Sequence, residues 1–259
     1  MNTPTNLDKY KRFFAFGCSF TSFMWPTWAD VISKEMPNAD FFNLGKSGSG
    51  NLLVSLRIAE ANARFKFTED DLVMVMFTTY TREDRWVEST WLTPGNIYNN
   101  DVYPKNWVKE FADERGYMIR DAALIDMSMK YLEMLPCDSF SMLSVPFSTG
   151  SNECDSPETV VPTDIIKLYS ETFDKFKPSM YELELKNWDV DYKGFSDGHP
   201  SPIRYFSYMK KLGFNLSVNT EKYALDATET LKNITNRNII PFIFTDQDSN
   251  ISRCDKLMF

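Results

Sequence analysis

Short runs of apolar residues alternate along this 259-residue chain with longer segments in which apolar residues recur at helical spacing. A short continuous run is typical of a strand covered on both faces, whereas a spacing of three or four residues is typical of an amphipathic helix. We therefore expect an open parallel sheet covered by helices. The predicted strands are residues 13–16, 41–44, 71–77 and 139–145, and the predicted helices are residues 27–36, 52–65, 121–134, 163–176, 202–212 and 220–236.

Four other regions have weaker patterns. Residues 86–117 are rich in Trp, Tyr, Asn and Pro and lack clear periodicity, which indicates an irregular insertion. Residues 148–162 are polar and interrupted by proline, so we expect a loop there. Residues 182–188 fit a strand or a loop, and the apolar residues 239–244 indicate a strand. The chain has no visible internal repeat or low-complexity tract.

Polar segments follow each of the first three predicted strands. Ser19 comes just after Gly17, a glycine-rich turn occupies residues 45–50, and charged side chains crowd residues 78–85. Because the carboxyl ends of parallel strands meet at one edge of the sheet, where ligands bind in such folds, we expect these segments to lie together. The glycine-rich turn lacks the spacing of a phosphate-binding loop. Two ordinary interpretations remain open: Ser19 as the N-cap of the next helix, and residues 78–85 as a solvated loop with local ion pairs.

His199 is the only histidine of the chain and lies in a loop punctuated by glycine and proline. A lone histidine is usually structural, but Asp197 lies two residues before it, close enough to orient the imidazole and to stabilise its protonated form. A serine hydroxyl is a weak nucleophile unless a neighbouring base removes its proton. Ser19, His199 and Asp197 therefore form a candidate set for nucleophilic catalysis.

Three short segments resemble, in chain order, the first, second and last conserved blocks of the SGNH (GDSL-like) hydrolases. They are G-C-S-F-T at residues 17–21, N-L-G-K-S-G at residues 43–48 and D-G-H-P at residues 197–200. The resemblance implies a three-layer α/β/α flavodoxin-like fold with a parallel central sheet. It also implies roles for individual residues: Ser19 as nucleophile, His199 as general base, Asp197 as the acid that orients it, and the backbone N–H groups of Ser19 and Gly48 as the oxyanion hole.

The chain departs from the pattern of this family at three places. Cys18 stands where the family commonly has an acidic residue, which makes its thiol an alternative nucleophile, although the alignment favours Ser19. One residue separates Asp197 from His199 where the family usually has two, which predicts a different local geometry. The third block, normally G-x-N-D, reads F-T-T-Y-T-R-E-D at residues 77–84 and lacks the asparagine that would donate to the oxyanion.

The missing donor matters, because losing one oxyanion donor typically lowers the rate about 10²- to 10³-fold. The candidate replacements are Thr79, Asn51 and Arg82. The pattern F-T-x-x-x-R-x-D is similar to a variant that we associate with SGNH-like proteins encoded by tailed phages of aquatic bacteria.

The resemblance assigns residues 1–213 to the hydrolase-like domain and leaves residues 214–259 as a C-terminal extension, packed on the domain or used in assembly. It implies a serine esterase that hydrolyses a small acyl ester, such as an acetyl ester. The aromatic side chains of the insertion suggest a carbohydrate substrate, unless they pack in the core. These side chains are Trp86, Trp91, Tyr98, Tyr103 and Trp107.

Two other functions remain open from the sequence. Transfer of the acyl group to an acceptor other than water would use the same residues. A catalytically weak or inactive SGNH-fold protein would instead serve as a structural or binding component of a virion or another assembly, and the exposed apolar residues 239–244 would favour association, including as a homo-oligomer.

Charge and composition narrow the partners and the location. The formal net charge of -8 argues against a nucleic-acid partner, because contacts to phosphate need clustered Lys and Arg. No apolar run approaches the roughly 18 residues of a membrane span, and the amino terminus lacks the pattern of a signal peptide. We therefore expect no membrane partner and a cytoplasmic or virion-associated location. Four scattered cysteines and dispersed acidic residues indicate reduced thiols, no metal site and no cofactor.

Overall fold

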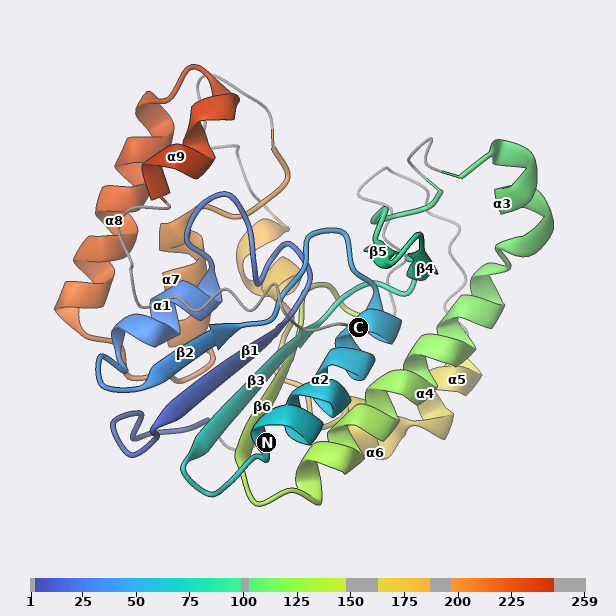
Figure 1. Cartoon of the computed structure of the whole chain (residues 1–259), viewed down its shortest axis with the longest axis horizontal. Helices are drawn as coiled ribbons and strands as arrows, with labels where there is room; N and C mark the ends of the chain where they lie inside the picture. The colour runs from blue at the N-terminus through green and yellow to red at the C-terminus, as the bar shows by residue number, and fades with distance from the viewer. Residues whose placement is uncertain (1–2, 99–102, 148–162, 187–196, 245–259) are drawn as a thin grey trace.

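The computed structural model describes residues 3–98, 103–147, 163–186 and 197–244. At its centre lies a four-stranded sheet in the order β2-β1-β3-β6, in which every neighbouring pair is parallel. The strands are β1 (Arg12–Gly17), β2 (Asp40–Asn43), β3 (Asp71–Phe77) and β6 (Asp138–Leu143). The four strands predicted from the apolar runs are therefore confirmed (Figure 1).

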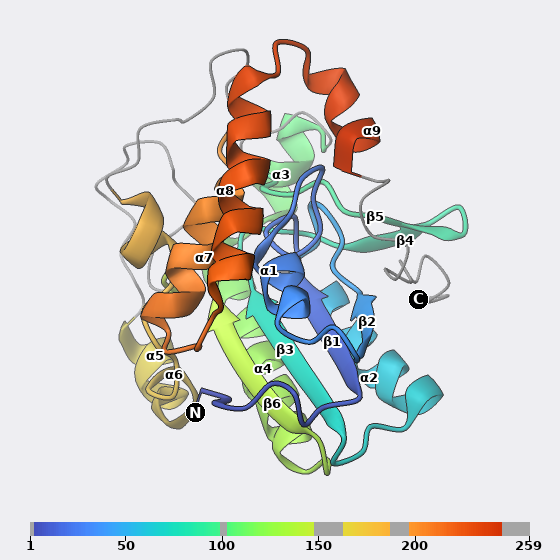
Figure 2. The same ribbon diagram turned by 90° about the vertical axis from the view of Figure 1, so that its left-hand side faces the viewer.

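Successive side chains of each strand point to opposite faces of the sheet, and helices bury both faces. Phe13 and Met74 pack on one side, whereas Phe14 and Val73 pack on the other. The first side is covered by α1 (Trp28–Lys34), α7 (Pro202–Lys211) and α8 (Val218–Asn233), and the second by α2 (Asn51–Phe65), α4 (Glu114–Glu133), α5 (Thr163–Leu168) and α6 (Ser170–Phe173). The predicted three-layer α/β/α architecture is confirmed (Figure 1, Figure 2).

The predicted helices lie where expected, but two of them differ in extent. α4 begins at Glu114 rather than at residue 121, because Asp113 caps it by accepting a hydrogen bond of 2.7 Å from the Gly116 N–H. The helix expected over residues 163–176 is interrupted at Tyr169, which separates α5 from α6. None of the helices described in the structure is long and apolar enough to cross a membrane.

Two regions with weaker patterns in the C-terminal half are helical where they are described. Residues 182–188 are expected to form a strand or a loop, but Tyr181–Leu185 forms a π-helical turn, η1. The strand predicted at residues 239–244 is wrong, since this stretch forms η2 (Arg237–Ile239) and the short helix α9 (Ile240–Phe244). A short apolar run does not distinguish a strand from a short buried helix, and Pro241 suits the first turn of a helix. The loop predicted at residues 148–162 lies outside the described residues.

The insertion is more regular than its composition indicates. It contains an antiparallel hairpin of β4 (Arg85–Val87) and β5 (Thr90–Leu92), followed by α3 (Lys105–Phe111). Tyr103 and Trp107 pack against the core, whereas Trp86 is 48% exposed. Core packing therefore explains some of the aromatic residues of the insertion and leaves others at the surface.

The described part of the C-terminal extension packs on the domain. α8 contacts α7 and α1, and Phe214 and Ala224 belong to the apolar core on that side of the sheet. In Figure 2, α7 and α8 lie across the face of the sheet that points toward the viewer. A boundary at residue 213 thus runs through one continuous core.

The carboxyl end of β1 is the point at which the strand order changes direction. The chain passes from β1 to β2 on one side and then returns to β3 on the other side of β1. The connecting loops diverge there, and open α/β sheets bind ligands in the resulting crevice. Ser19 follows β1 at this point.

Gly17→Ala is expected to destabilise the protein by about 2 kcal/mol or more, because a methyl group at this position would lie 2.2 Å from Thr21 Oγ1 and 2.7 Å from the Met76 carbonyl oxygen. Urea unfolding followed by circular dichroism measures the change. Gly116→Ala is the matched control, since its methyl group would meet no atom closer than 3.4 Å and would favour the helix. A Gly17→Ala variant as stable as the wild type would contradict this account of the turn.

Candidate active site

Ser19 lies in a tight turn between β1 and α1. The N–H groups of Thr21 and Ser22 donate to the carbonyl oxygen of Cys18, over 2.9 and 3.1 Å, and Ser19 is 5% exposed. The N-cap of α1 is Thr27, so Ser19 does not cap the helix. Cys18 is fully buried in the core on the α1 side of the sheet, so Ser19 is the more exposed of the two candidate nucleophiles.

The glycine-rich turn is hydrogen-bonded to the end of β1. The Gly17 carbonyl oxygen accepts hydrogen bonds from the Lys46 N–H at 3.0 Å and from the Ser49 hydroxyl at 3.2 Å. Gly48 has a φ of 76°, and a methyl group there would lie 2.1 Å from the Thr93 carbonyl oxygen, so only glycine fits. The turn that carries Gly48 therefore lies beside the turn that carries Ser19.

Asp197 contacts His199 directly. Its Oδ1 atom lies 2.5 Å from His199 Nδ1 and also accepts from the His199 backbone N–H at 2.9 Å. With only one residue between them, Asp197 can therefore still bond to the imidazole of His199. The other carboxylate oxygen, Oδ2, lies 2.5 Å from Nη2 of Arg237 in η2. Arg237 belongs to the C-terminal extension, and nothing in the sequence near it indicates this contact.

The surroundings of Asp197 keep its carboxylate ionised. Burial alone would raise the pKa of Asp197, but the hydrogen bonds and charge of His199 and the charge of Arg237 outweigh it and hold this pKa below its ordinary value. An ionised acid at this position can orient a histidine and stabilise an imidazolium.

Aromatic rings that follow Ser19 in the chain enclose the imidazole of His199. The ring of Phe23 stacks on it, with ring centroids 3.7 Å apart and an interplanar angle of 15°. Phe20 presents its ring at 5.5 Å in an edge arrangement. The indole N–H of Trp25 donates to the Pro200 carbonyl oxygen at 2.9 Å. The loop of Ser19 and the loop of His199 are therefore in direct contact.

Asn51, one of the candidate replacement donors, is fully buried at the start of α2. Its two amide hydrogens are used by the Thr78 carbonyl oxygen and by Asp121 Oδ2, each at 2.9 Å, and its Oδ1 accepts from the Thr78 N–H. These contacts join α2, α4 and the end of β3. They leave Asn51 no amide hydrogen for an oxyanion.

Thr79 and Arg82, the other two candidates, lie after the end of β3. The hydroxyl of Thr79 shares a hydrogen bond of 2.9 Å with the hydroxyl of Thr81. Arg82 donates from Nη1 to the Ser49 carbonyl oxygen at 2.9 Å, and its Nε is buried without a hydrogen-bond partner among the described residues. Arg82 is therefore the candidate that touches the turn of Gly48.

Two buried carboxylates stabilise the segment that stands in place of the third block. Asp84 accepts hydrogen bonds of 2.8 Å from two N–H groups at the start of α2 and so caps that helix. Asp121 accepts from Asn51 and lies 2.6 Å from Nε of Arg120. Burial raises the pKa of both acids, that of Asp121 to about 7. Asp121 was not singled out from the sequence, because a lone acid in an amphipathic helix gives no sign of its distant partners.

Within the described ranges, no three His, Cys, Asp or Glu side chains are grouped as ligands for a metal ion. The sequence matches no known family model, and it matches no curated protein at a significant level. Ser19, His199 and Asp197 are therefore candidates on the strength of the local resemblance and of the contacts around Asp197 and His199.

Asp197→Asn is expected to lower the free energy of unfolding by about 1.5–3 kcal/mol at pH 7, since a buried carboxylate that contacts Arg237 and His199 loses its charge. The pKa of Asp197 is lower in the folded protein than in the unfolded chain, so its ionised form stabilises the fold above about pH 4. The stability difference between wild type and variant should shrink as the pH falls below about 4. Urea unfolding between pH 3 and 7 measures it.

The control for this measurement is Asp164→Asn, which removes an exposed carboxylate paired with Arg115. Exposed ion pairs contribute little, so the control should behave like the wild type throughout. A stability difference for Asp197→Asn that does not change between pH 7 and pH 3 would show that the charge of Asp197 does not stabilise the fold.

Proposed function

We propose that this protein is a serine hydrolase that cleaves a small acyl ester, such as an acetyl ester, from a polar carrier. The observation that carries the proposal is the contact of Asp197 with His199 Nδ1, in a loop packed against the residues that follow Ser19. This arrangement lies where the strand order changes direction, the usual ligand site of such sheets.

In the proposed mechanism, His199 takes the proton of the Ser19 hydroxyl as that oxygen attacks the ester carbonyl carbon. Because Nδ1 of His199 faces Asp197, Nε2 is the nitrogen that accepts this proton. The tetrahedral intermediate expels the alcohol, which leaves with the proton from His199. Water, deprotonated by the same histidine, then attacks the carbonyl carbon of the acyl-serine. The bond to the Ser19 oxygen breaks, His199 returns the proton to that oxygen, and the carboxylic acid is released.

The oxyanion of the intermediate would be stabilised by the backbone N–H groups of Ser19 and Gly48. We choose Arg82 as the third donor, because its guanidinium contacts the carbonyl group of Ser49, next to Gly48, and its buried Nε has no partner within the part of the chain that the structure describes. A charged donor forms stronger hydrogen bonds to an anion than an amide does. Arginine can therefore compensate for the absent asparagine.

A fluorophosphonate probe is expected to form one adduct with the wild-type protein, on Ser19, because only an activated serine reacts with such a probe. Intact mass and peptide mapping identify the site. The adduct should be absent in Ser19→Ala and His199→Ala. Ser22→Ala is the matched control, since it removes a serine hydroxyl three residues further along the same loop and should still be labelled. Absence of any adduct on folded wild-type protein would refute an activated serine.

Arg82→Ala is expected to lower kcat for p-nitrophenyl acetate about 10²- to 10³-fold, the typical loss for one oxyanion donor. Arg82→Lys, which keeps the charge, should lose less. Thr79→Val tests the rival donor and should remain close to the wild type. Thermal denaturation of each variant separates a catalytic loss from a folding defect. A large loss of kcat in Thr79→Val, with Arg82→Ala unaffected, would reassign the donor.

A non-catalytic role in a virion or another assembly is the second candidate function. The low exposure of Ser19 favours it. The hairpin β4–β5 favours it as well, because Trp86 and Val87 are 48% and 41% exposed and offer an apolar surface to a partner. A defined oligomer in size-exclusion chromatography with light scattering, together with failure of the fluorophosphonate reaction, would support this candidate over the hydrolase.

A further inference from the structure

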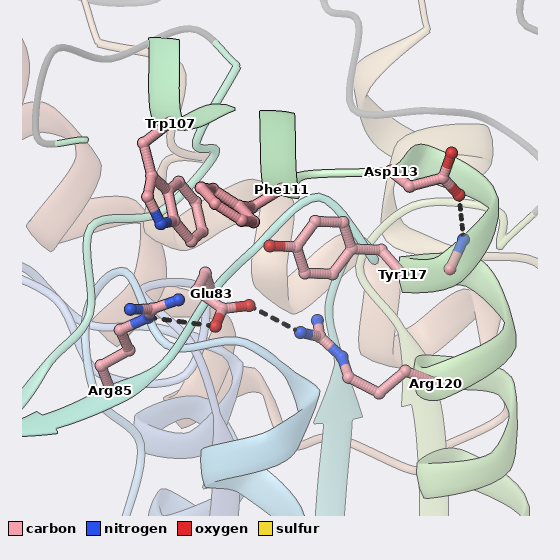
Figure 3. Close-up of a pocket in the computed structure, with 8 residues that line it drawn as sticks. Glu83, Arg85, Trp107, Phe111, Asp113, Tyr117 and Arg120 are labelled. Carbon is pink, nitrogen blue, oxygen red and sulfur yellow. Dashed lines mark hydrogen bonds and ion pairs between the residues drawn. The ribbon is translucent and has the colours of Figure 1, made fainter. Parts of the chain in front are cut away.

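A pocket of about 350 Å³ lies between α3, the start of α4 and the residues that follow β3 (Figure 3). Trp107 and Phe111 of α3 and Tyr117 of α4 form an aromatic side, which faces a charged side. The charged side consists of Glu83, Arg85 and Arg120. The volume is within the usual range of ligand pockets, about 300–1,000 Å³. Neither Ser19 nor His199 lines this pocket, so it is distinct from the candidate active site.

The polar groups of the charged side are held in place before any ligand binds. Glu83 bridges two arginines, with Oε1 at 3.2 Å from Arg85 Nε and Oε2 at 2.9 Å from Arg120 Nη1. Arg120 is held further by Asp121 at 2.6 Å and by the Arg82 carbonyl oxygen at 2.7 Å. A guanidinium has five donors and a carboxylate has about four acceptor sites, so these groups retain capacity for ligand hydroxyls.

The balance of charge argues against an anionic ligand. The two arginines face the carboxylate of Glu83, and Asp113 adds a second acidic group to the lining. The site therefore has no excess of positive charge, and the chain as a whole carries a formal net charge of -8. A carboxylate or phosphate ligand would therefore gain no net attraction from the charges of the lining, which favours a neutral ligand.

The aromatic side combines a ring held by neighbouring side chains with a ring that is open to solvent. Trp107 stacks on Tyr103, with ring centroids 4.7 Å apart, and the guanidinium of Arg85 lies 4.6 Å from the centroid of the Trp107 ring. The adjoining ring of Phe111 is 59% exposed. An exposed ring beside preformed hydrogen-bonding groups suits a ligand with one apolar face and one polar edge.

We infer that this pocket binds a neutral sugar residue of the carbohydrate that carries the ester. A pyranose presents C–H groups on one face, which pack on aromatic rings, and hydroxyl groups at its edge, which both accept from arginine and donate to a carboxylate. The link to an ester rests on the proposed function, whereas sugar binding itself does not.

The pocket lies on the same edge of the sheet as the candidate active site. Its charged side begins one residue after Arg82, whose guanidinium contacts the Ser49 carbonyl oxygen in the glycine-rich turn. Arg120 of the pocket in turn binds the Arg82 carbonyl oxygen. An oligosaccharide held in the pocket by one residue would therefore have its neighbouring residues on the edge that carries Ser19.

The test measures binding of unacylated neutral oligosaccharides, built from glucose, mannose, galactose or N-acetylglucosamine, to full-length Ser19→Ala protein by isothermal titration calorimetry and saturation-transfer NMR. At least one of them should bind saturably. Adding Phe111→Ala should weaken that binding about 3- to 10-fold, as expected for the loss of one ring contact. Phe111→Tyr should keep most of it. Phe242→Ala, which removes a 76% exposed ring of α9, is the control and should change nothing.

Several results would overturn the inference. They are failure of every neutral oligosaccharide to bind folded protein, binding that is unaffected by Phe111→Ala, and tighter binding of sulfated or uronic-acid oligosaccharides than of neutral ones. The fluorophosphonate reaction of wild-type protein is recorded in parallel. Labelling of Ser19 without sugar binding refutes the subsite alone, whereas sugar binding without labelling refutes the hydrolase and leaves the subsite in place.

Discussion

The candidate site depends on hydrogen bonds to the last carbonyl group of β1. They connect the turn that carries Ser19 to the glycine-rich turn that carries Gly48. The Gly17 carbonyl oxygen accepts two hydrogen bonds from the glycine-rich turn at residues 45–50, and the Thr21 carbonyl oxygen accepts another, at 2.8 Å, from the side chain of Asn43 in β2. Because β1 is buried on both faces, these bonds fix surface loops to the most rigid part of the fold. The sheet therefore positions Ser19. This position depends on the glycine at residue 17, because a larger side chain there would displace Thr21 or β3.

The C-terminal helices position the other half of the candidate site. Arg237 binds the carboxylate oxygen of Asp197 that does not face His199, and Ile240 packs with Trp25 in an apolar cluster beside the histidine loop. The described part of the extension thus supplies both a counter-charge and an apolar cover to the candidate site. The contacts of the candidate site therefore continue beyond residue 213, where the resemblance to known hydrolases ends.

Those parts of the structure that depend on local pattern could be predicted, and those that depend on distant partners could not. Because helices bury both faces of the sheet, each strand is a nearly continuous apolar run. The sequence therefore predicts the four strands and the loops at their carboxyl ends. The apolar run at residues 239–244 was misassigned, because its helix is selected by the packing of Ile240 against distant residues. The contacts of Asp121 and Arg237 join residues far apart in the chain, and no spacing in the sequence reveals them.

In the proposed mechanism, the two arginines near the site act on opposite halves of the reaction. Arg237 adds its charge to the hydrogen bonds of His199 that keep Asp197 ionised, and its guanidinium contacts the carboxylate oxygen that does not face His199. Arg82 would add a full positive charge on the side of the oxyanion, where the family uses a neutral amide. Arg237 would therefore hold the acid that orients the proton acceptor, whereas Arg82 would stabilise the negative charge that develops on the substrate.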